Sequence, residues 1–140
     1  MTRSVLISIT GTQISGGDQE EVEMLTTGDY FFKNGKHYIL YEEIEEDSRQ
    51  ITKNTIKIDG DSMDIMKKGN INTHMVFQKD KKNLSCYMTP FGELTVGIHT
   101  SEVHVEKEED TLTANIRYAL DINYEHVSNL SITVEVRSRE

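Results

Sequence analysis

The sequence is poor in the residues that build covalent crosslinks, rigid linkers and membrane segments. Its 140 residues include one cysteine, one proline and no tryptophan. The lone Cys86 excludes a disulfide within the chain and is typical of a reducing compartment. No segment approaches the roughly 20 apolar residues that a membrane-spanning helix needs. The short apolar stretch Val5–Ile9 is interrupted by Ser8 and lacks a signal-peptide cleavage pattern. We therefore expect a cytoplasmic protein.

Basic residues are also scarce. Fifteen lysines and arginines stand against 24 aspartates and glutamates, which gives a formal net charge of −9 and a pI of about 5.0. Surfaces that bind phosphates need clustered cations, so we expect neither nucleic acid nor an anionic membrane as a partner. The one basic cluster, Lys79, Lys81 and Lys82 around Asp80, is interpreted as the tip of a hairpin.

The dominant pattern is an alternation of apolar and polar residues with a period of two. It is clearest in Leu94–Ile98, Leu112–Leu120 and Leu130–Val136. Successive side chains of a strand point to opposite faces, so this pattern predicts antiparallel strands with one face on a core. Turn signals separate the runs, and Asn34-Gly35 is the strongest because a type I′ turn needs positive φ at both central residues.

These signals predict about ten short strands joined by tight turns. The segment Glu20–Leu25 could form one helical turn, but its continuation into further strand-like residues favours a strand. A meander of this length would expose two edges unless it closes on itself. We therefore predict a single all-β domain over residues 1–140, an antiparallel up-and-down meander closed into a barrel, with a sandwich as the second choice.

Several segments in the same order carry a resemblance to a known family. They are Gly35–Glu43, Asn54–Ile58, Met75–Phe77, Tyr87–Leu94 and Tyr118–Asn123. Together they resemble the bacterial YwiB-like family, a domain of unknown function placed in the calycin (lipocalin-like) superfamily. The resemblance spans nearly the whole chain. It implies a β-barrel of calycin type and no particular reaction, because one fold hosts many functions.

Polar residues beside predicted apolar strand faces are the candidates for ligand binding. We name Tyr41, Glu42, Glu43, Asn54 and Thr55. If Ile39 and Tyr41 face the interior, then Glu43 follows them; if Leu40 does, then Glu42 follows. Both faces are partly apolar, so the pattern leaves the choice open. A carboxylate at the rim that pairs with a lysine such as Lys53 or Lys57 is the simpler interpretation.

No catalytic or metal-binding motif is visible. His99 and His104 are an odd number of residues apart, so they face opposite sides unless a bulge intervenes. His74 falls on the face opposite Met75 and Phe77, hence in solvent. Cys86 alternates with Leu84 and Met88, which predicts a buried core residue. We expect no catalytic residue, no metal and no cofactor.

These observations favour a non-enzymatic barrel that binds a small molecule. The alternative is a protein–protein interaction domain or homodimer that uses the outer surface of the barrel, and the chain would be a monomer or a homodimer. An enzyme ranks third, because the sequence supplies no convergent acid, base and nucleophile.

Overall fold

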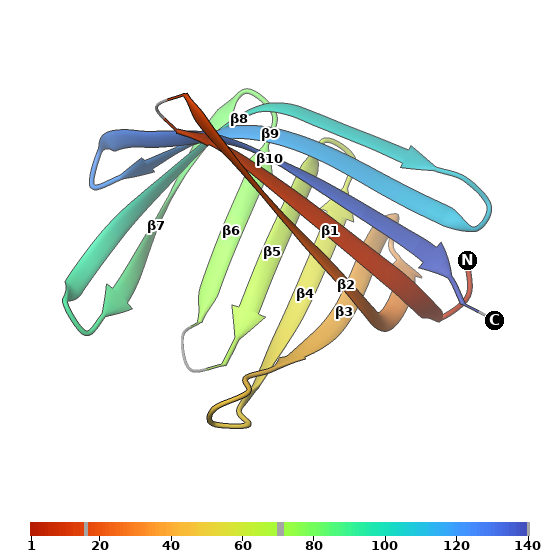
Figure 1. The fold of residues 1–140 in the computed structure, drawn as a ribbon. Coiled ribbons are helices and arrows are strands. Elements are labelled where there is room, and N and C mark those ends of the chain that lie inside the picture. Colours follow the sequence, from red (N-terminus) through yellow and green to blue (C-terminus); the bar gives the residue numbers. More distant parts are fainter. Residues whose placement is uncertain (16, 70–71, 140) are drawn as a thin grey trace.

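The computed structural model of the chain, which describes residues 1–15, 17–69 and 72–139, is built entirely from β-strands and turns (Figure 1). These described ranges contain no helix, and so none that could cross a membrane. The ten strands are β1 (Ser4–Ser15), β2 (Asp18–Lys33), β3 (Lys36–Ile44), β4 (Ile51–Asp59), β5 (Ser62–Lys68), β6 (Thr73–Gln78), β7 (Lys81–Thr89), β8 (Gly92–Lys107), β9 (Thr111–Ile122) and β10 (Glu125–Ser138).

All ten strands belong to one antiparallel sheet, in the order β6-β5-β4-β3-β2-β1-β10-β9-β8-β7. Strands that follow each other along the chain are neighbours, and β1 pairs with β10, from Val5 opposite Ser138 to Ile14 opposite Asn129. The sheet twists and curls until its two end strands, β6 and β7, lie near each other (Figure 1). The predicted all-β meander is confirmed as a nearly closed barrel.

Residues with positive φ mark the turns between several consecutive strands. Asn34 and Gly35 have φ values of 54° and 77°, as the type I′ turn between β2 and β3 requires. Gly60 has φ 58° in the turn between β4 and β5, and Asp80 has φ 62° in the turn that joins β6 to β7. The segment Glu20–Leu25 lies within β2, so the preference for a strand there is confirmed.

The core is filled by side chains that alternate onto the inner face of the sheet. At its centre the rings of Phe77 and Tyr118 meet edge to face, with centroids 4.9 Å apart. Apolar residues from eight strands, including β9 itself, surround Phe77 and Tyr118: Val5, Ile7, Tyr30, Ile39, Tyr41, Ile56, Ile58, Met63, Ile65, Val96, Ile98, Val103, Leu112, Ala114, Ile116, Val134 and Val136.

Side chains, rather than a backbone ladder, join β7 to β6. Asn83 Nδ2 donates to the carbonyl oxygen of Val76 at 3.4 Å. Ser85 Oγ and Tyr87 Oη donate to the carbonyl oxygen of His74 at 3.3 and 3.2 Å. The connection at Lys79–Lys82 is therefore a turn between strands that share no ladder, and not the tip of a regular hairpin as predicted.

The same arrangement overturns the prediction for Cys86. Cys86 is exposed, and so are Leu84 and Met88, at 55% and 73%. The inner positions of β7 are taken by the polar residues that bond to β6. Because side chains alternate along a strand, the apolar residues of β7 lie on its outer face, in contact with solvent and not with the core.

Candidate functional site

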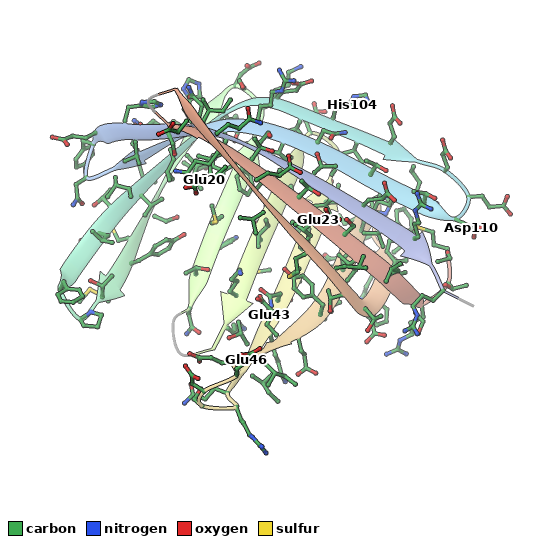
Figure 2. The ribbon with its side chains drawn as sticks, in the orientation of Figure 1. Glu20, Glu23, Glu43, Glu46, His104 and Asp110 are labelled. Atoms are coloured by element: carbon green, nitrogen blue, oxygen red, sulfur yellow. The ribbon has the colours of Figure 1, made fainter. Side chains whose placement is uncertain are left out.

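The strands β2 and β3 separate part of the way along their length. Their pairing runs from Lys33 opposite Lys36 to Asp29 opposite Leu40 and ends there. Beyond this point β2 remains paired with β1 and β3 remains paired with β4 as far as Ile44. Figure 2 shows the acidic side chains of Glu20 and Glu23 along β2, that of Glu43 near the end of β3 and that of Glu46 in the turn that follows β3. An opening in the barrel wall follows from this divergence.

Gly28 is the residue at which the two strands part. An ideal Cβ at this position would lie 2.2 Å from the carbonyl oxygen of Leu40 and 2.8 Å from Cδ1 of Ile7. No real Cβ occupies such a position, so the backbones of β2 and β3 can approach this closely only because residue 28 is glycine. The close contact at Gly28 thus defines the narrow end of the opening.

A cavity of about 670 Å³ lies at this narrow end. This volume falls within the range of sites that hold small molecules, roughly 300–1,000 Å³. Residues from β2, β3, β4 and β5 form its wall: Thr26, Thr27, Gly28, Asp29, Leu40, Tyr41, Glu42, Lys53, Asn54, Thr55, Met66 and Lys68. The wall therefore combines hydroxyl, amide, carboxylate and ammonium groups with two apolar side chains.

Four polar residues on the inner face form what we call the inner cluster: Tyr41 and Asn54, which belong to this wall, and Glu43 and Lys67, which lie beside it. Asn54 lies opposite Tyr41 on β3 and opposite Lys67 on β5. Its Nδ2 donates to Glu43 Oε1 at 2.9 Å, and Lys67 Nζ lies 3.4 Å from the same oxygen. Glu43 is thus shared between an amide and an ammonium group.

The members of the inner cluster differ in their access to solvent. The side chains of Glu43 and Lys67 are 42% and 41% exposed, whereas Asn54 is 1% exposed. Burial, and then the negative charge of Glu43, raise the pKa of the Tyr41 hydroxyl to about 12. Tyr41 therefore stays protonated near neutral pH and can both donate and accept a hydrogen bond.

Asn54 has a buried side-chain oxygen, Oδ1, without a hydrogen-bond partner among the described residues. Two buried hydroxyls, Thr100 Oγ1 and Ser128 Oγ, share this property, but of the three residues only Asn54 belongs to the wall of the cavity. A buried acceptor without a partner costs about 1–3 kcal/mol, so such atoms are rare in folded proteins.

The five predicted binding residues all lie at this opening, on two faces of the sheet. Tyr41, Glu42, Asn54 and Thr55 contribute to the wall of the cavity. Glu43 shares the inner face with Tyr41, which answers the question that the sequence left open.

Sequence reasoning missed Lys67, the lysine that pairs with Glu43 in place of the expected Lys53 or Lys57. Counting outward from the turn at Gly60 places Lys67 opposite Asn54, so the signal was present in the sequence.

The histidines do not converge on a common point. A bulge between Thr100 and Glu102 on β8 shifts the alternation, so His99 and His104 are both exposed (Figure 2 labels His104). His74 is exposed, as predicted, and its Nε2 lies 2.9 Å from Asp64 Oδ2. Among residues 1–15, 17–69 and 72–139, no group of three or more histidine, cysteine or acidic side chains could hold a metal ion.

Comparisons with known proteins agree with this architecture. The chain is 29% identical over 121 residues to a protein of Bacillus subtilis (strain 168) described as an uncharacterized beta-barrel protein, YwiB, and the match covers 85% of this chain and 84% of that protein. The crystal structure of the B. subtilis ywiB protein matches with a TM-score of 0.78 and 26% identity, over 97% of this chain and 93% of that one. The family model DUF1934, a domain of unknown function, matches residues 7–134, and the chain therefore belongs to this family.

Proposed function

We propose that this protein is a non-enzymatic binding barrel that holds a small polar molecule at the opening between β2 and β3. The observation that carries the proposal is Asn54, almost completely buried, with an unpaired Oδ1, in the wall of a cavity of about 670 Å³. A ligand that donates a hydrogen bond to this oxygen would remove the cost of burying it unpaired.

The inner cluster indicates the kind of group that the ligand presents. Because Nδ2 of Asn54 is held by the Glu43 carboxylate, the unpaired atom of this amide is the acceptor. The ligand must therefore supply an N–H or O–H donor. The contact between Glu43 and Lys67 is long, at 3.4 Å, and both side chains are partly exposed. Such pairs contribute little to stability, so a donor on the ligand can replace Lys67 at low cost.

Tyr41 supports a binding role rather than a role in proton transfer. Its raised pKa keeps the phenol protonated, whereas a general base needs a pKa near the working pH. The inner cluster offers hydrogen bonds and a single shared carboxylate, and the described residues of the cavity wall include no cysteine or serine. This chemistry is suited to holding a ligand unchanged.

Native mass spectrometry of the freshly purified chain tests the proposal. We expect a bound small molecule whose mass is lost on denaturation. Glu43→Gln should release it, because the glutamine still accepts from Asn54 Nδ2 but no longer attracts a donor through its charge. Glu93→Gln, at an exposed position of β8 outside the wall of the cavity, is the matched control. A ligand-free wild-type protein that is also not stabilised by any member of a library of amines and alcohols would contradict the proposal.

The second candidate is a homodimer formed through the outer surface at β7. Its outer residues Leu84 and Met88 are exposed, and Phe91, at the adjoining turn, is 100% exposed. Contact of this exposed apolar face with the same face of a second copy is compatible with two-fold symmetry. A ligand-free species with twice the mass of the chain in the same measurement would favour this function.

We also propose a reducing, cytoplasmic location. Cys86 is a free, exposed cysteine. An exposed thiol persists in the reduced form where glutathione and thioredoxin are active, and forms disulfides readily outside the cell.

A further inference from the structure

A second cavity, of about 540 Å³, lies at the other end of β3, which we call the aromatic end cavity. Its wall is Met1, Arg3, Tyr30, Phe31, Phe32, His37 and Lys107. His37 and Glu43 stand near opposite ends of β3, and the two cavities share no residue. A ligand in one would therefore make no contact with the wall of the other.

Three rings of this wall are held in fixed positions. Tyr30 Oη and His37 Nδ1 are joined by a hydrogen bond of 2.7 Å, and the two rings are 5.9 Å apart. Phe32 lies opposite His37 in the β2–β3 ladder, with ring centroids 4.9 Å apart. Phe32 is nonetheless 61% exposed, so one face of this group of rings is open to a flat ligand. Aromatic rings favour such offset or tilted stacking.

The charged members of the wall are all cationic. Among the described residues of the wall, Arg3 and Lys107 are the two with charged side chains, although the chain carries a net charge of −9. The guanidinium of Arg3 lies over the ring of Phe31, 4.7 Å from its centroid. The Lys107 ammonium donates to the backbone carbonyl oxygens of Glu108 and Glu109, which leaves one of its three donors. Both cations are thereby held in place at the cavity.

His37 adds a directional donor to the wall. Burial, and then the positive charge of Lys107, lower its pKa, so its imidazole is neutral near pH 7. When Tyr30 donates to Nδ1, the remaining proton of the imidazole is on Nε2. His37 then presents an N–H group beside the two cations.

We propose that the aromatic end cavity binds a planar aromatic anion, with its ring against Phe32 and His37 and its carboxylate or phosphate on Arg3 and Lys107. Each part of the ligand has its counterpart in the wall: a partly exposed ring for the ring, a planar guanidinium for the anionic group and an ammonium with one free donor. This site is independent of the one proposed between β2 and β3.

An NMR titration of the full chain with benzoate tests this site, with benzyl alcohol as the uncharged probe. We expect benzoate to shift the amides of Arg3, Phe32 and His37 to saturation and benzyl alcohol to shift them little. Arg3→Gln should weaken benzoate binding by about tenfold or more, and Phe32→Ala should also weaken it. Lys36→Gln removes a nearby cation that is paired with Asp59 and should leave the affinity unchanged.

Three results would overturn the proposal. Benzoate shifts that do not saturate, equal binding of benzyl alcohol, or an Arg3→Gln variant with wild-type affinity and a folded spectrum would each do so. The variant Glu43→Gln belongs to the other site and should bind benzoate like the wild type. If benzoate does not bind, the proposal for the β2–β3 opening is unaffected. If no ligand binds at the β2–β3 opening, the proposal for the aromatic end cavity is likewise unaffected.

Discussion

Asn54 Nδ2 donates a 2.9 Å hydrogen bond to Glu43 Oε1, and this bond determines which end of the amide is left unpaired. If the amide were rotated by half a turn, two acceptor oxygens would face each other. The acceptor Oδ1 therefore remains as the atom without a partner, inside a barrel wall that opens at this point. The proposed ligand chemistry rests on this orientation.

The first prediction exchanges the amide for a second carboxylate. Asn54→Asp places two acidic groups in contact in a buried position, so we expect a loss of about 1–3 kcal/mol in the free energy of unfolding at neutral pH. The loss should shrink as the pH falls and the new carboxyl takes up a proton. Urea denaturation measures it. The double variant Asn54→Asp with Glu43→Gln restores an amide–carboxylate pair and should recover most of the loss; a double variant as unstable as the single one would contradict the assignment.

The second prediction concerns the close approach at Gly28. Gly28→Ala forces the backbone of β2 away from Leu40, because the new Cβ would overlap the Leu40 carbonyl oxygen. We expect a destabilisation of about 2 kcal/mol or more, comparable to an overpacked core. Gly11→Ala in β1 is the control, since an ideal Cβ there has no heavy atom within 4 Å. Equal midpoints for the two variants in urea would show that the approach at Gly28 is not essential.

Much of the fold could be predicted from the sequence, because period-two alternation and turn residues act locally. Asn34-Gly35 determines the register of β2 and β3, and regular alternation identifies most of the strands. The choice between Glu42 and Glu43 was open because both faces of β3 carry apolar residues. Which of them faces the core depends on strands far away in the chain.

The wrong prediction for Cys86 and the missed aromatic end cavity have the same physical origin. The apolar alternation of Leu84, Cys86 and Met88 predicted a core face, yet the inner positions of β7 are needed for side-chain bonds to β6. The aromatic end cavity joins Arg3 and Lys107, which are distant in sequence, so only the closed sheet brings them together. Local patterns report which residues share a face, and the closure of the barrel decides which face is buried.

The third prediction is a pH dependence of stability through His37. Its folded pKa lies below the unfolded value of 6.5, because of burial first and the charge of Lys107 second. The unfolded chain therefore binds the proton more readily, and stability should fall as the pH is lowered through 6.5 towards the folded pKa. Urea midpoints of wild type and His37→Gln should converge over this range. Lys107→Gln should reduce the slope, and an NMR titration of His37 that shows no lowering would contradict the explanation.

The fourth prediction concerns the tyrosines, of which the chain has six. Tyr41 and Tyr118 should both ionise near pH 12, because burial disfavours their phenolates. The unfolded value is 10.0, so the stabilisation linked to these groups is present below pH 10 and is lost as the pH rises through about 12. The ultraviolet absorbance of tyrosinate follows the titration. Tyr41→Phe and Tyr118→Phe should each remove one late-ionising group, and early ionisation of all six would contradict their burial.

The last prediction tests how the barrel closes between β6 and β7. Ser85 and Tyr87 both donate to the carbonyl oxygen of His74, so the double variant Ser85→Ala with Tyr87→Phe removes two of the bonds across this boundary. We expect a loss of about 1–2 kcal/mol, since each hydrogen bond contributes about 1 kcal/mol. Amide hydrogen exchange should increase in β6 and β7 and remain unchanged in β1 and β10, which are joined by a full backbone ladder. Met88→Ala, on the exposed face of β7, is the control. If the double variant exchanges like the control, these side chains do not hold the barrel closed, and packing of Phe77 against Tyr118 must do so instead.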